Sequence, residues 1–127
     1  MHLIKLFLSL LFISHSIFAQ PTFTENIIST NAGGPASVYA TDVDGDGDMD
    51  VLSASVNDNR IIWYENNENQ GFTEQVITTN ATMAFSVYAA DVDGDGDMDV
   101  LSASFLNNKI AWYENNENQG FTEQVIT

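Results

Sequence analysis

Short segments in which hydrophobic and polar residues alternate run through the chain from residue 23 onward. This period of two predicts β-strands, because successive side chains of a strand point to opposite faces. Clusters of Asp, Gly and Asn separate the segments and favour tight turns. No stretch after residue 20 has the apolar spacing of an amphipathic helix. The sequence therefore predicts an all-β structure, with strands at 37–41, 50–55, 60–65 and 72–78, the same four strands 49 residues later, and an additional strand of the last type at 23–30.

The set of alternating segments occurs twice in the chain, as an internal repeat of 49 residues. Residues 23–71 align without a gap on residues 72–120, with 36 of 49 positions identical, and residues 121–127 repeat 72–78. We therefore expect a repeat region at 20–127, with repeat 1 at 23–71, repeat 2 at 72–120 and a partial repeat 3 at 121–127.

Four antiparallel strands in 40–50 residues are typical of one β-propeller blade. A closed propeller has about 4–8 blades, so two blades plus partial strands predict a piece of a larger propeller. Open blade edges expose unpaired strand groups. Neighbouring repeats or self-association are therefore the expected partners of this segment, and an isolated copy is expected to associate or to stay partly unfolded.

The first nineteen residues differ in composition from the rest. Lys5 precedes an apolar run at 6–13, and the small residue Ala19 ends the segment before Gln20. This arrangement predicts a secretory signal peptide at 1–19. The alternative is a membrane anchor, but the run is shorter than the roughly 20 apolar residues that a span needs. We expect a secreted or cell-surface protein with no membrane span after signal removal.

Composition then narrows the function. The 127-residue chain has 18 acidic and 3 basic residues, a formal net charge of −15 and no cysteine. Such a charge disfavours nucleic acid as a partner. Both histidines lie in the predicted signal peptide, so the mature chain lacks the groups for a His base, a catalytic triad or a thiol nucleophile. We expect no enzyme activity, and we expect Arg60 and Lys109 to be solvated charges at the starts of strands.

Two identical acidic loops carry the candidate chemistry. Residues 42–50 and 91–99 each place five carboxylates in nine positions, with glycines between them. Calcium takes 6–8 oxygen ligands, and side chains at loop positions 1, 3, 5 and 9 with a carbonyl at position 7 suit it. Position 12 of an EF-hand would be Ser53 or Ser102, so that motif does not fit. The predicted ligands are Asp42, Asp44, Asp46 and Asp50 with the carbonyl of Asp48, and Asp91, Asp93, Asp95 and Asp99 with the carbonyl of Asp97.

The expectation is about one Ca²⁺ per loop. Magnesium ranks lower because it demands stricter octahedral geometry and retains waters. A solvated acidic turn with no fixed ion is the other alternative.

A D-x-D-x-D-G-x-x-D loop between two strands, in a repeat of this length, resembles the FG-GAP and VCBS-type repeats. These repeats build integrin-α-like β-propellers and many secreted bacterial surface proteins, and the resemblance covers residues 23–127. It implies that the aspartates at loop positions 1, 3, 5 and 9 are calcium ligands. The chain departs from the family pattern at 37–39, where Ser-Val-Tyr stands in place of Phe-Gly, and at 53–55, where Ser-Ala-Ser stands in place of Gly-Ala-Pro.

The expected function is adhesion or ligand binding, with an extracellular protein or carbohydrate as the ligand and calcium in a structural role. The alternative is a noncatalytic propeller module of a larger secreted enzyme, such as one that degrades polysaccharides. Trp63, Trp112, Tyr64 and Tyr113 are predicted core residues, with a carbohydrate platform as the alternative. The asparagine-rich segments at 66–69 and 115–118 are predicted turns, although they could also hydrogen-bond sugars.

Overall fold

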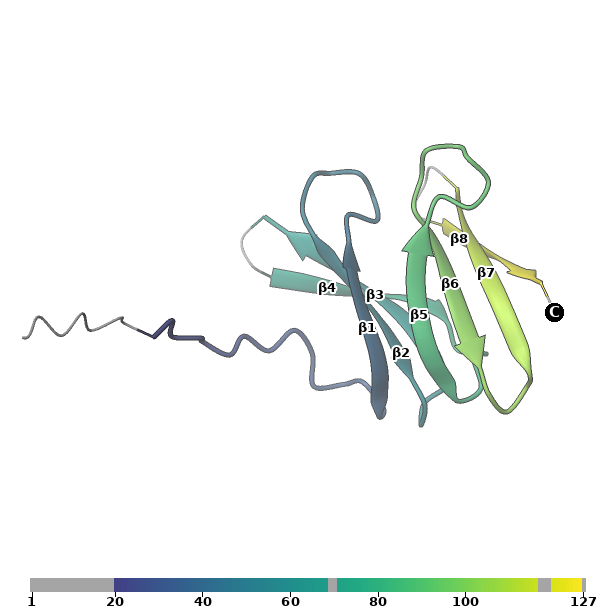
Figure 1. Ribbon diagram of the computed structural model, residues 1–127, viewed down its shortest axis with the longest axis horizontal. Coiled ribbons are helices and arrows are strands. Elements are labelled where there is room, and N and C mark those ends of the chain that lie inside the picture. The colour runs from purple at the N-terminus through teal and green to yellow at the C-terminus, as the bar shows by residue number, and fades with distance from the viewer. Residues whose placement is uncertain (1–19, 69–70, 117–119, 127) are drawn as a thin grey trace, which may run out of the picture.

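The computed structural model describes residues 20–68, 71–116 and 120–126, so the predicted signal peptide lies outside the described residues. Two four-stranded antiparallel sheets, each a simple meander, make up the fold (Figure 1). The described part of the chain contains no helix, and hence none that could cross a membrane. The all-β prediction is confirmed, and each sheet has the strand order of a propeller blade. The first sheet is β1 (Pro35–Thr41), β2 (Asp50–Ser55), β3 (Arg60–Asn67) and β4 (Gly71–Thr78), and the second is β5 (Ala84–Ala90), β6 (Asp99–Ser104), β7 (Lys109–Asn116) and β8 (Gly120–Val125).

Each sheet presents two different faces, which follow from strand register. In the first sheet Leu52 lies opposite Trp63, and Val51 lies opposite Tyr64. Residues that pair across strands share a face, so one face of each sheet carries the tryptophan and the other carries the tyrosine. We call them the tryptophan face and the tyrosine face. The tryptophan face comprises Tyr39, Leu52, Ala54, Ile61 and Trp63 in the first sheet, and Tyr88, Leu101, Ala103, Ile110 and Trp112 in the second.

The hydrophobic core forms where the tryptophan face of the first sheet packs on the tyrosine face of the second. Trp63 and Tyr113 are each 1% exposed there, which confirms that they are core residues. Strands β1 and β2 both contact β5 across this interface. Trp112, the counterpart of Trp63, is only partly buried because no third sheet covers it among the described residues. The second sheet contributes Val87, Ala89, Val100, Ala111 and Tyr113 to the core.

The prediction of a strand at 23–30 is wrong. These residues form no ladder, and Phe23 is 93% exposed. Their near-copy at 72–79 supplies β4, which pairs along β3. A strand needs a partner edge for its backbone groups, and no described strand pairs with residues 23–30. The local sequence favours a strand, but none of the described strands offers residues 23–30 an edge for pairing.

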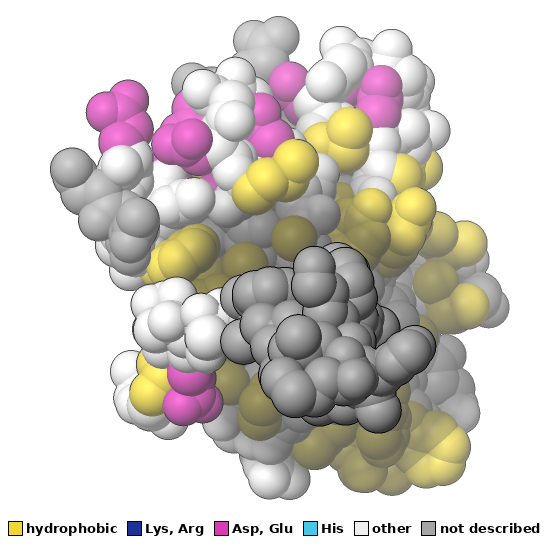
Figure 2. Space-filling view, turned by 60° about the vertical axis from the view of Figure 1, so that its left-hand side comes forward, with side chains coloured by type: hydrophobic (Ala, Val, Ile, Leu, Met, Phe, Trp, Pro, Cys, Tyr) yellow, Lys and Arg dark blue, Asp and Glu magenta, His cyan; other side chains and the backbone are white. Residues whose placement is uncertain are grey.

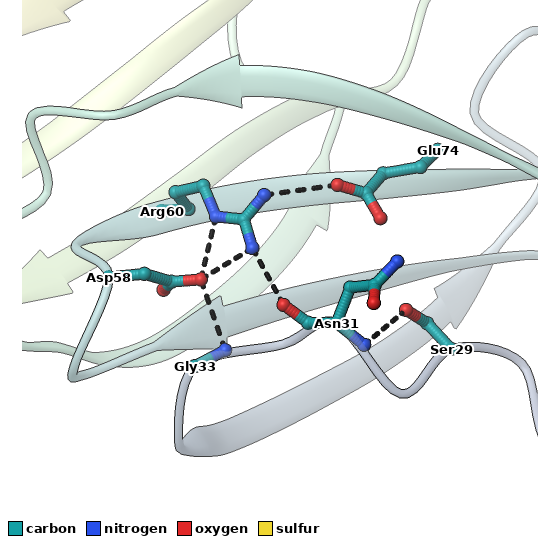
Figure 3. Close-up of polar contacts among 6 residues, drawn as sticks. All are labelled: Ser29, Asn31, Gly33, Asp58, Arg60 and Glu74. Atoms are coloured by element: carbon teal, nitrogen blue, oxygen red, sulfur yellow. Dashed lines mark hydrogen bonds and ion pairs between the residues drawn. The ribbon is translucent and has the colours of Figure 1, made fainter.

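Arg60 anchors the segment that leads into β1 (Figure 3). Its Nε donates to Asp58 Oδ2 at 2.6 Å, its Nη1 to Glu74 Oε1 at 3.0 Å, and its Nη2 to the Asn31 carbonyl at 2.8 Å. The Gly33 amide also donates to Asp58 Oδ2, at 3.0 Å. Arg60 is therefore a clamp and not the solvated charge that the sequence predicts.

Lys109 repeats this clamp in the second sheet. Its Nζ pairs with Glu123 at 2.6 Å and donates to the Asn80 carbonyl at 3.4 Å, which fixes the linker between β4 and β5. Asn107 stands in place of Asp58 and donates to the same carbonyl. In both repeats a basic side chain therefore binds the segment that leads into the first strand of the sheet. The second repeat lacks the carboxylate that Asp58 provides in the first.

Hydrogen bonds in the Arg60 clamp stabilise the ionised form of Asp58. Partial burial raises the pKa of Asp58, but hydrogen bonds from Arg60 and the Gly33 amide outweigh that effect and leave the pKa below its ordinary value. A carboxyl group whose pKa is lowered by folding stabilises the fold above its unfolded pKa, and this contribution is lost as pH falls through the folded pKa. The clamp is therefore expected to hold at neutral pH and to release only in acid.

We expect Arg60→Gln to loosen the segment at 31–34 without unfolding the sheets. A partly exposed ion pair contributes on the order of 0.3–1 kcal/mol, so amide hydrogen exchange at Val56 and Asn57, which donate to the carbonyls of Gly34 and Gly33, should rise about two- to fivefold. The matched variant Lys109→Gln should instead raise exchange at Phe105 and Leu106. Equal effects of both variants on both pairs of amides would contradict these local roles.

Candidate metal centre

Both acidic loops lie at the same end of the molecule, where the first strand of each sheet turns into the second (Figure 1). Acidic side chains gather at that end in Figure 2, with hydrophobic side chains below them. A cleft of about 280 Å³ separates the two loops, lined by residues of both, including Asp42, Met49, Asp97 and Met98. Two loops of strong negative charge therefore lie next to each other.

The first loop winds around the side chain of Asp42. Its Oδ1 accepts the Gly45 amide at 2.8 Å, and its Oδ2 accepts the Gly47 amide at 3.0 Å. Gly45 and Gly47 have φ of 77° and 98°, a backbone conformation that strains residues with a Cβ. Asp91 organises the second loop in the same way, with bonds of 2.7 Å and 3.1 Å. The glycines of the motif therefore let the chain curl back on its first aspartate.

Three carboxylates of each loop converge. Each of Asp42, Asp44 and Asp50 offers one oxygen, and these oxygens all lie within 4.8 Å of one another. Asp91, Asp93 and Asp99 form the same cluster in the second loop. The structure thus brings together positions 1, 3 and 9 of each predicted ligand set.

The remaining aspartates of the motif lie outside these clusters. Asp46 is exposed, and its Oδ1 accepts the Asp48 amide at 2.8 Å. Asp95 does the same for the Asp97 amide at 2.9 Å. These side chains stabilise the turn locally in this structure.

Asp50 is the most constrained residue of the first loop. It is fully buried, and its two oxygens accept the Val43 amide at 3.0 Å and the Asn66 amide at 2.8 Å. Asp99 accepts the equivalent amides in the second loop at 2.9 Å and 2.8 Å. Each carboxylate oxygen can accept more than one bond, so these contacts leave capacity for a cation. The ninth position therefore connects the loop to the third strand of its sheet.

Desolvation and, after it, nearby negative charges raise the pKa of the carboxyl group at the third position of each loop. For Asp44 the causes are desolvation first and then the nearby charges of Asp46, Asp50 and Glu65. The pKa of Asp93 is raised by desolvation first and then by the charges of Asp95 and Asp99. Like charges at such distances repel, so an ionised loop favours a cation among its carboxylates. The donor set is made of oxygen alone, which suits a hard cation such as Ca²⁺ or Mg²⁺.

Asn115 joins the two loops, a role that the sequence reasoning missed. This residue is 6% exposed, and its Nδ2 donates both to the Met98 carbonyl of its own loop and to the Val43 carbonyl of the first loop, each at 3.2 Å. Its counterpart Asn66 donates only to the Met49 carbonyl, at 3.1 Å. An asparagine-rich segment predicts a turn, and only the neighbouring sheet reveals the second acceptor.

Comparison with known protein families identifies the type of repeat. A family described as an FG-GAP-like repeat matches the chain at residues 16–53 and 42–102. No curated protein and no solved structure gives a significant match.

We expect Asn115→Ala to weaken the contact between the two loop ends more than Asn66→Ala does. Removing Asn115 leaves a buried carbonyl of the first loop without a donor, which costs about 1–3 kcal/mol. Asn66→Ala removes one exposed hydrogen bond, worth about 0.5–1.5 kcal/mol. Urea denaturation of both variants measures the difference, and equal losses of the free energy of unfolding would show that the bond to Val43 contributes nothing.

Proposed function

Because the chain belongs to the FG-GAP-like repeat family, we propose that it is a secreted, calcium-binding β-propeller segment that serves adhesion or ligand binding. The ions are structural, about one in each acidic loop. The observation that carries this proposal is the pair of clusters at positions 1, 3 and 9, which recur in both loops with nearly the same hydrogen bonds. Both copies of the nine-residue sequence adopt this arrangement.

The proposed ligands divide into two groups. Asp42, Asp44 and Asp50 hold the ion with carboxylate oxygens that already lie close together, and their counterparts do so in the second loop. Asp46 adds a side-chain oxygen and Asp48 adds its backbone carbonyl, as Asp95 and Asp97 do in the second loop. Calcium fits better than magnesium because it accepts six to eight oxygens in flexible geometry.

Ion binding stabilises the blade through Asp50. This side chain belongs to the cluster and also accepts an amide from the end of β3, so order in the loop is transmitted to the strand pairing. A ligand that binds only the folded chain stabilises it by mass action. An extracellular module needs only modest affinity, with Kd on the order of 10⁻⁴ to 10⁻³ M.

The chain itself is proposed to be noncatalytic, as FG-GAP repeat domains typically are. Its proposed ligand is an extracellular protein or a carbohydrate. Of the four aromatic side chains considered as a carbohydrate platform, Trp63, Tyr64 and Tyr113 are buried and Trp112 is partly buried. Loop and edge residues are therefore the better candidates for ligand contacts in this segment.

Calcium titration tests the metal assignment. We expect calorimetry to show two ions per chain, and we expect chelator to lower the melting temperature. Asp44→Ala should remove one ion and leave the second loop intact, because a cluster of three then keeps only two carboxylates. Asp93→Ala should do the same for the other loop, with the first loop unaffected.

Asp48→Ala is the matched control for the calcium experiment. It removes the same charge from the same loop, but only its carbonyl is proposed to touch the ion, so both ions should still bind. No calcium uptake by the unaltered chain, together with a melting temperature unchanged by chelator, would refute the metal assignment.

Export is tested by the N-terminus of the secreted product. Cleavage after Ala19 predicts a mature chain that begins at Gln20, and mass spectrometry of secreted material measures this. Recovery of the chain in a membrane fraction with Met1 intact would show instead that the apolar run is an anchor.

A further inference from the structure

The core is formed by the tryptophan face of the first sheet and the tyrosine face of the second. The tyrosine face of the first sheet and the tryptophan face of the second lie outside this core. Ile61 of the first tryptophan face is fully buried, but its counterpart Ile110 on the second sheet is 49% exposed. Val87 of the second tyrosine face is 4% exposed, but its counterpart Val38 on the first sheet is 70% exposed. The two described sheets therefore present, on their outer sides, copies of the two surfaces that are covered between them.

The exposed tryptophan face repeats the buried one residue for residue. Its five core positions carry Tyr, Leu, Ala, Ile and Trp in both sheets. A hollow of about 330 Å³ opens on this side, lined in part by Phe85, Phe105 and Ile110. The rings of Phe85 and Phe105 lie 6.1 Å apart beside it, and both are at least half exposed. This face is apolar and has no cover among the described residues.

The tyrosine face of the first sheet is covered only imperfectly. A cavity of about 150 Å³ lies between this face and the segment that precedes β1, lined by residues that include Ile28, Ser29, Val51 and Tyr64. The hydroxyls of Ser53 and Tyr64 are buried there without a hydrogen-bond partner. A buried hydroxyl without a partner is costly, so this cover is a poor substitute for a packed interface.

The hydroxyls of Ser102 and Tyr113, which correspond to Ser53 and Tyr64, are satisfied in the covered interface, whereas Ser104 Oγ and Trp63 Nε1 have no hydrogen-bond partner there. Ser102 and Tyr113 lie 3.3 Å apart and share a hydrogen bond beneath the first sheet. The apolar positions of the tyrosine face are Val38, Ala40, Val51, Ile62 and Tyr64 in the first sheet, and Val87, Ala89, Val100, Ala111 and Tyr113 in the second. Only Ile62 in place of Ala111 differs between them. The first tyrosine face is therefore built to receive a tryptophan face, as the second one does.

We propose that the exposed tryptophan face of one copy of this chain docks on the tyrosine face of a second copy, head to tail, in the geometry that already joins the two sheets. The interface is heterologous, so repetition closes into a ring when the rotation allows it. Propellers typically close with about 4–8 blades, so a ring built only from the two blades at residues 35–125 needs about two to four copies. The inference does not depend on calcium or on any external ligand.

Docking of a second copy on the tyrosine face of the first sheet displaces only part of the segment that precedes β1. Residues 31–34 are held by Arg60 at the same place where Lys109 holds the linker at 80–83, so this stretch is compatible with docking. The residues before it, where Ile27 is 68% exposed, make way for the incoming face. Repulsion between copies of net charge −15 opposes assembly, so added salt should strengthen it.

The test uses the purified chain in sedimentation equilibrium and native mass spectrometry. We expect a closed assembly of two to four copies that grows with protein concentration and salt. Ile110→Lys and Val38→Lys should each reduce the chain to a monomer, because each buries a charge in one of the two docking faces. Leu106→Lys is the matched control: it places the same charge at an exposed apolar position in the β6–β7 turn, and it should leave assembly unchanged.

Mixing the two monomeric variants gives the decisive result. Each retains one intact face, so Ile110→Lys and Val38→Lys chains together should form a 1:1 dimer and nothing larger. An isologous interface would not be restored in this way. The proposal is overturned if the unaltered chain stays monomeric, if either face variant assembles as the unaltered chain does, or if the mixture stays monomeric. Circular dichroism confirms that the variants keep their sheets, which is expected because both positions are exposed.

Discussion

A buried carboxylate at the start of the second strand organises each blade. Asp50 accepts one amide from the beginning of its acidic loop and another from the end of β3, so it joins three parts of the chain that are separated in sequence. Without those bonds two backbone amides would lose their partners next to a fully buried charge. The loop itself is wound around Asp42, which accepts the Gly45 and Gly47 amides. Asp50 therefore belongs to the architecture and to the proposed metal centre.

The repeated sequence produces two sheets with unequal surroundings. The first sheet buries its tryptophan face, and the second buries its tyrosine face, so identical residues differ in exposure according to which neighbour they have. Asn66 and Asn115 show the same effect among polar residues, since only Asn115 has a neighbouring loop within reach. The environment of a residue in this fold depends on the adjacent blade as much as on its own strand.

Local pattern predicts most of the strands because alternation and turn chemistry are properties of adjacent residues. The eight observed strands lie where the alternation places them, with ends that differ by a few residues. The prediction fails at 23–30, where a sequence that shares five of eight residues with 72–79 finds no edge to pair with. It also misses the roles of Arg60 and Asn115, because their acceptors are backbone carbonyls far away in sequence. In the loops, spacing predicts a concentration of carboxylates, but which three converge depends on the fold of the turn.

The unequal burial of the two tryptophans gives the chain a pair of built-in optical reporters. Trp63 is sealed between the sheets, while Trp112 in the same local sequence is partly open to solvent. Fluorescence from the first tryptophan therefore reports on the contact between the blades. Fluorescence from the second reports on whatever approaches the outer face, since a water-soluble quencher reaches Trp112 far more easily than Trp63. The quencher-accessible and the quencher-protected parts of the emission therefore distinguish the outer face from the contact between the blades.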